Sequence, residues 1–170
     1  MIKKKLKIMF LCSYYWNGVV DWGANESDIV KIDWQLRLIS YLIDQGHIVL
    51  TKQHPECEFK MPNFFFDTIG ARDVVGNFEK VYEQADILLI DNPQSSVFGY
   101  ALTTFKPVIF IDFGYQKLKS NESNLLKKRC YIVRGSTLNN NQLNIDWNDL
   151  HTGLKECFLL DDRQYPETII

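Results

Sequence analysis

The sequence has little of what marks secreted, metal-binding or membrane-spanning proteins. Its four cysteines, Cys12, Cys57, Cys130 and Cys157, form no CxxC pair. We therefore expect neither a disulfide scaffold nor a zinc site, but reduced thiols in a cytoplasmic protein. No apolar run approaches the length of a transmembrane segment, and the first run, LKIMFLC, is too short for a signal peptide.

The sequence also lacks a strong charge of either sign and the common nucleotide-binding fingerprints. Its formal net charge is −2, so it has no general electrostatic reason to bind nucleic acid or an anionic bilayer. Neither GxGxxG nor GxxxxGK[ST] occurs. No pair of His, Cys or carboxylate residues has a convincing metal-ligand spacing. We expect no metal ion and no resident cofactor.

Apolar runs that alternate with segments of helical periodicity are what the sequence does contain. The 170 residues, of which 46% are hydrophobic, suit a single domain covering residues 1–170. Continuous apolar runs are typical of buried parallel strands. The pattern predicts a doubly wound, Rossmann-like α/β domain, with about six parallel strands and helices on both faces. The expected strands are 7–12, 47–52, 64–69, 86–91, 108–112 and 130–134, and the expected helices 28–45, 78–84, 96–105, 121–128 and 147–160.

A polar cluster, DNPQSS, interrupts the two most apolar strands. Pro93 favours a turn, which leaves Ser95 and Ser96 at the start of a helix. A helix N-terminus offers free N–H groups and partial positive charge, and the hydroxyls add donors, so this turn suits a phosphate group. The alternative is that a serine here is simply an N-cap. One serine is enough for a cap, and the presence of two favours a phosphate site.

Other polar residues follow neighbouring strands, where ligands of open parallel sheets bind. Lys52 and His54 lie in KQHPE after the second strand, and Ser13 opens the segment after the first. Lys52 can supply charge and His54 can donate to a phosphate oxygen, although a lone loop histidine is most often only a surface residue. Asp91 and Asp112 each end a strand, where a carboxylate binds a hydroxyl or a cation or is an ordinary strand end.

Two of these segments together resemble a known family. KQHPE resembles the K-x-HP motif of bacterial GT-B transferases that build surface and capsular polysaccharides. The stretch 85–112 resembles their aDilitD-x-SS segment followed by KP, and similarity to CDP-glycerol glycerophosphotransferases is looser. The resemblance covers about residues 7–135. It departs from the motif where Asn92, Pro93 and Gln94 separate Asp91 from the serines, and where the acidic residue that often follows the serines is absent.

The resemblance implies one half of a GT-B fold, the C-terminal domain that binds a nucleotide-sugar donor. By this resemblance, His54, Ser95 and Ser96 of this sequence would contact the donor's phosphates or ribose. It also implies an acceptor-binding domain in front or a partner chain, so we expect no turnover by this chain alone and assign no catalytic residue. Were turnover found, Asp21, Glu26 and Asp91 would be the first candidates for the base.

Two further hypotheses remain open. The first is that the chain is a non-catalytic nucleotide-binding or flavodoxin-like module. The second is that it is a half-domain that works only with a partner chain. Four aromatic residues of the first loop, Tyr14, Tyr15, Trp16 and Trp22, would supply a partner surface, stack on a base or sugar, or simply pack beneath the loop.

Overall fold

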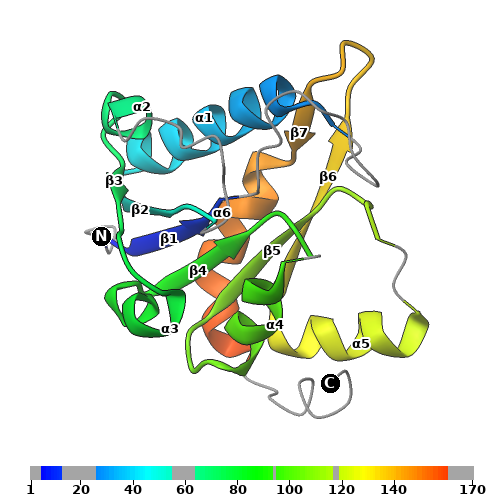
Figure 1. The fold of residues 1–170 in the computed structure, drawn as a ribbon. Helices are drawn as coiled ribbons and strands as arrows, with labels where there is room; N and C mark the ends of the chain where they lie inside the picture. The colour runs from blue at the N-terminus through cyan, green and yellow to red at the C-terminus, as the bar shows by residue number, and fades with distance from the viewer. Residues whose placement is uncertain (1–4, 13–25, 55–63, 94, 117–118, 161–170) are drawn as a thin grey trace.

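A mostly parallel sheet of seven strands forms the centre of the molecule, as a computed structural model shows (Figure 1). The structure describes residues 5–12, 26–54, 64–93, 95–116 and 119–160. The strand order is β3-β2-β1-β4-β5-β6-β7, in which the first six strands are parallel and β7 pairs with β6 in antiparallel fashion. The predicted Rossmann-like α/β class is confirmed, with one strand more than expected.

The strands and helices have the following bounds. The strands are β1 (Lys7–Leu11), β2 (Ile48–Lys52), β3 (Arg72–Asp73), β4 (Ile87–Ile90), β5 (Val108–Asp112), β6 (Tyr131–Thr137) and β7 (Leu143–Ile145). The helices are α1 (Asp28–Asp44), α2 (Phe64–Asp67), α3 (Phe78–Val81), α4 (Ser96–Thr103), α5 (Ser120–Arg129) and α6 (Trp147–Glu156). Short 3₁₀ turns, Tyr82–Gln84 and Cys157–Leu159, extend α3 and α6.

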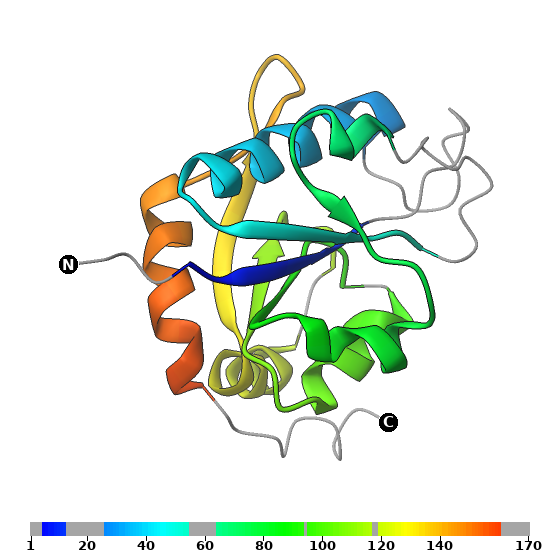
Figure 2. The same ribbon diagram turned by 90° about the vertical axis from the view of Figure 1, so that its left-hand side faces the viewer.

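Two hydrophobic clusters hold helices on the two faces of the sheet. Ile8 and Phe10 of β1 face α1 and α6, whereas Met9 and Leu11 face α3 and α4. All the residues of β4 and β5 are buried, as continuous apolar strands require when both faces are covered. Figure 2 shows α1 and α2 above the strands and α3, α4 and α5 below them, with α6 at the left beside β6. The phosphate-site candidates of the sequence therefore follow strands in a three-layer fold.

The third strand of the prediction is wrong. Residues 64–69 were expected to be a strand because they begin with three phenylalanines. Instead Phe64–Asp67 is α2, with the Phe66 side chain only 1% exposed in the core. The third strand is Arg72–Asp73, within the segment expected to be a link. The strand β7, at the opposite edge, was not predicted. Both edge strands are short, so neither carries the long apolar run that marks a buried strand.

A buried arginine fixes the end of α4 that lies away from its serines. Arg129, at the end of α5, is 1% exposed. Its guanidinium donates hydrogen bonds of 2.7–3.3 Å to the carbonyl oxygens of Ala101, Leu102, Thr104 and Lys106. A cation at a helix C-terminus also interacts favourably with the helix dipole. These contacts set the position of α4, and so of its N-terminus.

Within the described part of the chain, no helix is both long and apolar enough to cross a membrane.

Candidate functional site

A pocket of about 250 Å³ lies at the carboxyl ends of β1, β2 and β4. From β1 the chain builds outward through β2 to β3 and then crosses back to β4 on the other side of β1. The neighbours β1 and β4 therefore form the topological switch point, where open α/β sheets bind ligands. The first turns of α3 and α4 complete the lining. We call this space the switch-point pocket.

Four of the six residues predicted for ligand binding line this pocket. Lys52 and His54 lie at the end of β2, and Ser95 and Ser96 lie at the start of α4. They come from segments about forty residues apart in the sequence. The parallel sheet brings them together, as the carboxyl-edge rule predicts.

The other two predicted residues are placed differently. Asp91 does not line the pocket and is only 5% exposed. Its Oδ2 accepts a hydrogen bond of 3.2 Å from Trp34 Nε1 of α1. Asp91 therefore attaches α1 to the end of β4. Ser13 lies outside the described residues, as do Pro55 of the HP pair, Asp21, and the aromatic residues at 14–16 and 22.

The two adjacent serines differ in their contacts. Ser95 is the N-cap of α4, and its Oγ accepts a hydrogen bond of 3.3 Å from the Val97 N–H. Ser96 is the first helical residue and is exposed, and its hydroxyl makes no hydrogen bond to a described residue. The N-cap alternative thus holds for Ser95. The hydroxyl of Ser96 stays available to a ligand in the pocket.

The charged residues of the pocket do not neutralise one another. Lys52 is half-buried, and its Nζ donates to the backbone oxygen of Gln53 at 2.8 Å. Glu79, in the first turn of α3, also lines the pocket, yet it makes no ion pair or hydrogen bond with any described residue. A basic and an acidic residue therefore line the same pocket without pairing with each other.

The sequence did not reveal Gln53, Asn77 and Glu79 as lining residues. Asn77 and Glu79 follow the true β3 by a few residues. The carboxyl-edge rule would have selected their segment had β3 been placed correctly. Gln53 lies within KQHPE, between Lys52 and His54. Lys52 was predicted because of its charge and His54 because of the HP motif, and Gln53 has neither feature.

A half-buried carboxylate supports Gln53 from β3. Asp73 accepts hydrogen bonds of 3.4 Å from both Gln53 Nε2 and Thr51 Oγ1. Burial raises the pKa of Asp73, while hydrogen bonds from the Val74 backbone and the Thr51 hydroxyl act in the opposite direction. Because a carboxylate only accepts hydrogen bonds, the Gln53 amide must turn its nitrogen towards Asp73.

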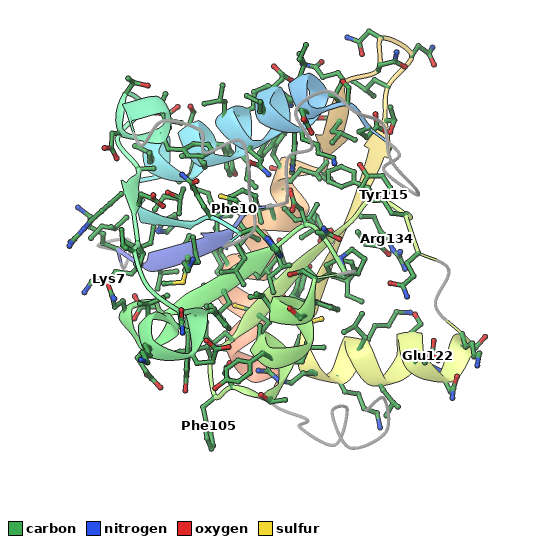
Figure 3. All side chains as sticks on the ribbon, viewed as in Figure 1. Lys7, Phe10, Phe105, Tyr115, Glu122 and Arg134 are labelled. Carbon is green, nitrogen blue, oxygen red and sulfur yellow. The ribbon has the colours of Figure 1, made fainter. Side chains whose placement is uncertain are left out.

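A second polar cluster lies at the same edge, beyond β5 and β6. Asp112 accepts a hydrogen bond from the Gly114 N–H at 2.8 Å and forms an ion pair with Arg134. Figure 3 shows Arg134 and Tyr115 together at this edge, far from Lys7 at the start of β1. Burial, and then the charges of Glu26 and Asp91, raise the pKa of Tyr115. Asp112 thus binds the loop and strand beside it.

Comparison of the sequence with models of known protein families, and with curated proteins, finds no match. In the described residues, no three side chains of His, Cys, Asp or Glu gather in a way that would hold a metal ion. The lining of the pocket includes an ammonium, an imidazole, two hydroxyls and a carboxylate, from Lys52, His54, Ser95, Ser96 and Glu79.

Proposed function

We propose that this chain binds a nucleotide-activated sugar in the switch-point pocket, as the donor half of a glycosyltransferase of surface polysaccharide synthesis. The observation that carries the proposal is the convergence of Lys52, His54 and Ser96 on one pocket at the switch point. These are hydrogen-bond donors, and Lys52 carries a full positive charge. They suit the phosphates of a nucleotide better than any neutral ligand.

The pocket residues would act on the leaving nucleoside phosphate. When the bond between sugar and phosphate breaks, negative charge grows on the phosphate oxygens. Lys52, the Ser96 hydroxyl and the positive end of the α4 dipole would stabilise that charge. His54 would donate a further hydrogen bond. This role needs no base from the same pocket.

The size of the pocket favours partial burial of the donor. About 250 Å³ is slightly below the 300–1,000 Å³ usual for small-molecule sites. The pocket therefore suits the phosphate and pentose, with the sugar extending beyond it. A second domain or a partner chain would contact that sugar.

A non-catalytic nucleotide-binding module is the second candidate, and the positions of the acidic residues favour it. The Trp34 indole binds Asp91, and Glu26 accepts a hydrogen bond of 3.0 Å from the Thr137 hydroxyl. Among the described residues, only Glu79 brings a carboxylate to the pocket. Nucleotide release from a nucleotide-sugar, measured with and without candidate acceptors, separates an enzyme from a binding module.

The binding step is tested by titration calorimetry with a panel of nucleoside diphosphates. We expect Ser96→Ala to weaken binding by about 1.5–3 kcal/mol, a tenfold to hundredfold loss, because a charge-assisted hydrogen bond disappears. Ser95→Ala should instead lower the melting temperature, since loss of a helix cap costs about 1 kcal/mol.

Ser120→Ala is the matched control, because Ser120 is the first residue of α5 and does not line the pocket. It should leave nucleotide affinity unchanged. Equal affinity of wild type and Ser96→Ala for every nucleotide bound would contradict the assigned role of Ser96. Absence of binding by any nucleotide would refute the proposed function itself.

A further inference from the structure

One wall of the switch-point pocket carries polar side chains that the fold itself does not use. Asn77 is the N-cap residue of α3 by position, yet its side chain makes no capping hydrogen bond. Glu79, two residues later, is exposed and has no hydrogen-bond or ion-pair partner among the described residues. Both line the pocket. A structural role in capping or pairing therefore does not account for them.

The charge of Glu79 limits what the pocket can hold. Like charges repel, and they repel more strongly at a protein surface than in bulk water because the effective dielectric constant is lower. A bare phosphate or polyphosphate that filled the pocket would meet this repulsion. A ligand that turns its phosphate towards Lys52 and hydrogen-bond donors towards Glu79 would satisfy both walls.

Adjacent hydroxyl groups are the donors that suit a carboxylate best here. The two oxygens of Glu79 can accept one hydrogen bond from each hydroxyl of a diol, and the Asn77 amide can both donate and accept. In dinucleotide-binding sheets, an acidic residue contacts the ribose in the same way. The ribose ring is joined to its phosphate through C5′ and one ester oxygen, so a pocket of about 250 Å³ can contact both groups of one nucleotide.

We propose that Asn77 and Glu79 bind the hydroxyl groups of a ribose, and that they make the pocket selective for ribonucleotides over deoxyribonucleotides. This inference rests on the proposed nucleotide binding and adds a residue-level basis for specificity. The carboxylate of Glu79 carries most of the discrimination, because hydrogen bonds to a charged acceptor are stronger than those to a neutral amide.

The test compares each nucleoside diphosphate with its 2′-deoxy form by titration calorimetry. Wild type should bind the ribo form about tenfold more tightly or better. In Glu79→Gln the ratio should fall to threefold or less, with affinity for the deoxy form unchanged or improved. Glu83→Gln is the control, because Glu83 follows α3 in the chain but pairs with Lys106 outside the pocket. It should keep the wild-type ratio.

The possible failures are distinguishable. If wild type binds no nucleotide, both the proposed function and this inference fail. If it binds ribo and deoxy forms equally, or if Glu79→Gln keeps the wild-type ratio, the function stands and the inference is overturned. A last comparison uses a nucleoside diphosphate and the same nucleotide carrying a hexose. If Glu79→Gln lowers affinity for the nucleotide-sugar but not for the nucleoside diphosphate, Glu79 binds hydroxyls of the transferred sugar. The ribose assignment is then wrong.

Discussion

Hydrogen-bond partners, more than residue type, separate the functional candidates from their neighbours. Ser95 and Ser96 are chemically identical, yet only the Ser95 hydroxyl accepts from the start of α4. Asp91 and Glu79 are both acidic. Asp91 binds the Trp34 indole, 57 residues away in the sequence, whereas the Glu79 carboxylate has no hydrogen-bond or ion-pair partner among the described residues. The buried Asp91 needs its partner, whereas the exposed Ser96 and Glu79 side chains are not engaged by the fold and can bind a ligand.

Tyr131 and Asp149 provide a pH-dependent contact between β6 and α6. The Tyr131 hydroxyl donates to Asp149 Oδ1 at 2.7 Å. This hydrogen bond, and then burial, raise the pKa of Tyr131 to about 12, against about 10 in the unfolded chain. The folded protein therefore keeps a proton that the unfolded chain loses. The stability from this contact is complete below pH 10 and declines between pH 10 and 12.

We expect Tyr131→Phe to cost less stability at pH 11 than at pH 8.5. Because the pair is partly exposed, the cost at pH 8.5 should stay below about 1 kcal/mol. Urea unfolding of both proteins at the two pH values measures the difference, and comparison within each pH cancels the effects of other tyrosines and lysines. A cost that grows at pH 11 would mean that the hydrogen bond does not hold the proton on Tyr131.

At the scale of the elements, two helical glycines differ in whether a side chain would fit at their position. A Cβ added to Gly153 of α6 would lie 2.6 Å from Tyr131 Cδ1, whereas one added to Gly99 of α4 would meet no heavy atom within 4 Å. The absent side chain at Gly153 thus lets α6 approach β6 closely, and the same approach allows the bond between Tyr131 and Asp149. Gly99 has no such packing role.

The substitutions Gly153→Ala and Gly99→Ala should therefore change stability in opposite directions. In a helix interior, Ala is favoured over Gly by about 1 kcal/mol, so Gly99→Ala should stabilise the protein by up to that amount. Gly153→Ala should destabilise it by about 1–3 kcal/mol, because overpacking against the Tyr131 ring outweighs the helix preference. Chemical denaturation at neutral pH measures both. Stabilisation by both substitutions would show that α6 can move away from β6 at little cost.

At the scale of the whole molecule, the centre of the sheet was predictable and its edges were not. The expected strands that became β1, β2, β4, β5 and β6 are marked by apolar runs. The central strands β4 and β5 are buried along their whole length, as strands covered on both faces are. Edge strands form through pairing with a neighbour, which leaves little local signal. The pattern therefore does not predict the strands Arg72–Asp73 and Leu143–Ile145. It predicts a strand in the phenylalanine-rich segment that forms α2.

The difference between central and edge strands also determines which residues of the site could be predicted from the sequence. Lys52, His54, Ser95 and Ser96 follow strands that were placed correctly, so the carboxyl-edge rule selected them. Asn77 and Glu79 follow β3, which was placed several residues too early. Partners that are distant in sequence, such as Trp34 for Asp91, cannot be inferred from spacing at all, so the burial of Asp91 had to come from the structure.

The edges also predict how the molecule opens. The outer strand β7 pairs with one strand only, and Arg37 Nη2 of α1 donates to its Leu143 oxygen at 2.6 Å. We expect backbone amides of β4, which has neighbours on both sides and is fully buried, to exchange with solvent only through global unfolding. Those of β7 should exchange much faster, through local opening of the edge.

Arg37→Ala should speed exchange in β7 further while leaving the rate in β4 set by global stability. Hydrogen–deuterium exchange with peptide resolution measures both strands in one experiment, so β4 serves as the internal reference. Exchange in β7 as slow as in β4, in wild type and variant alike, would show that the sheet opens as one unit and that Arg37 does not secure its edge.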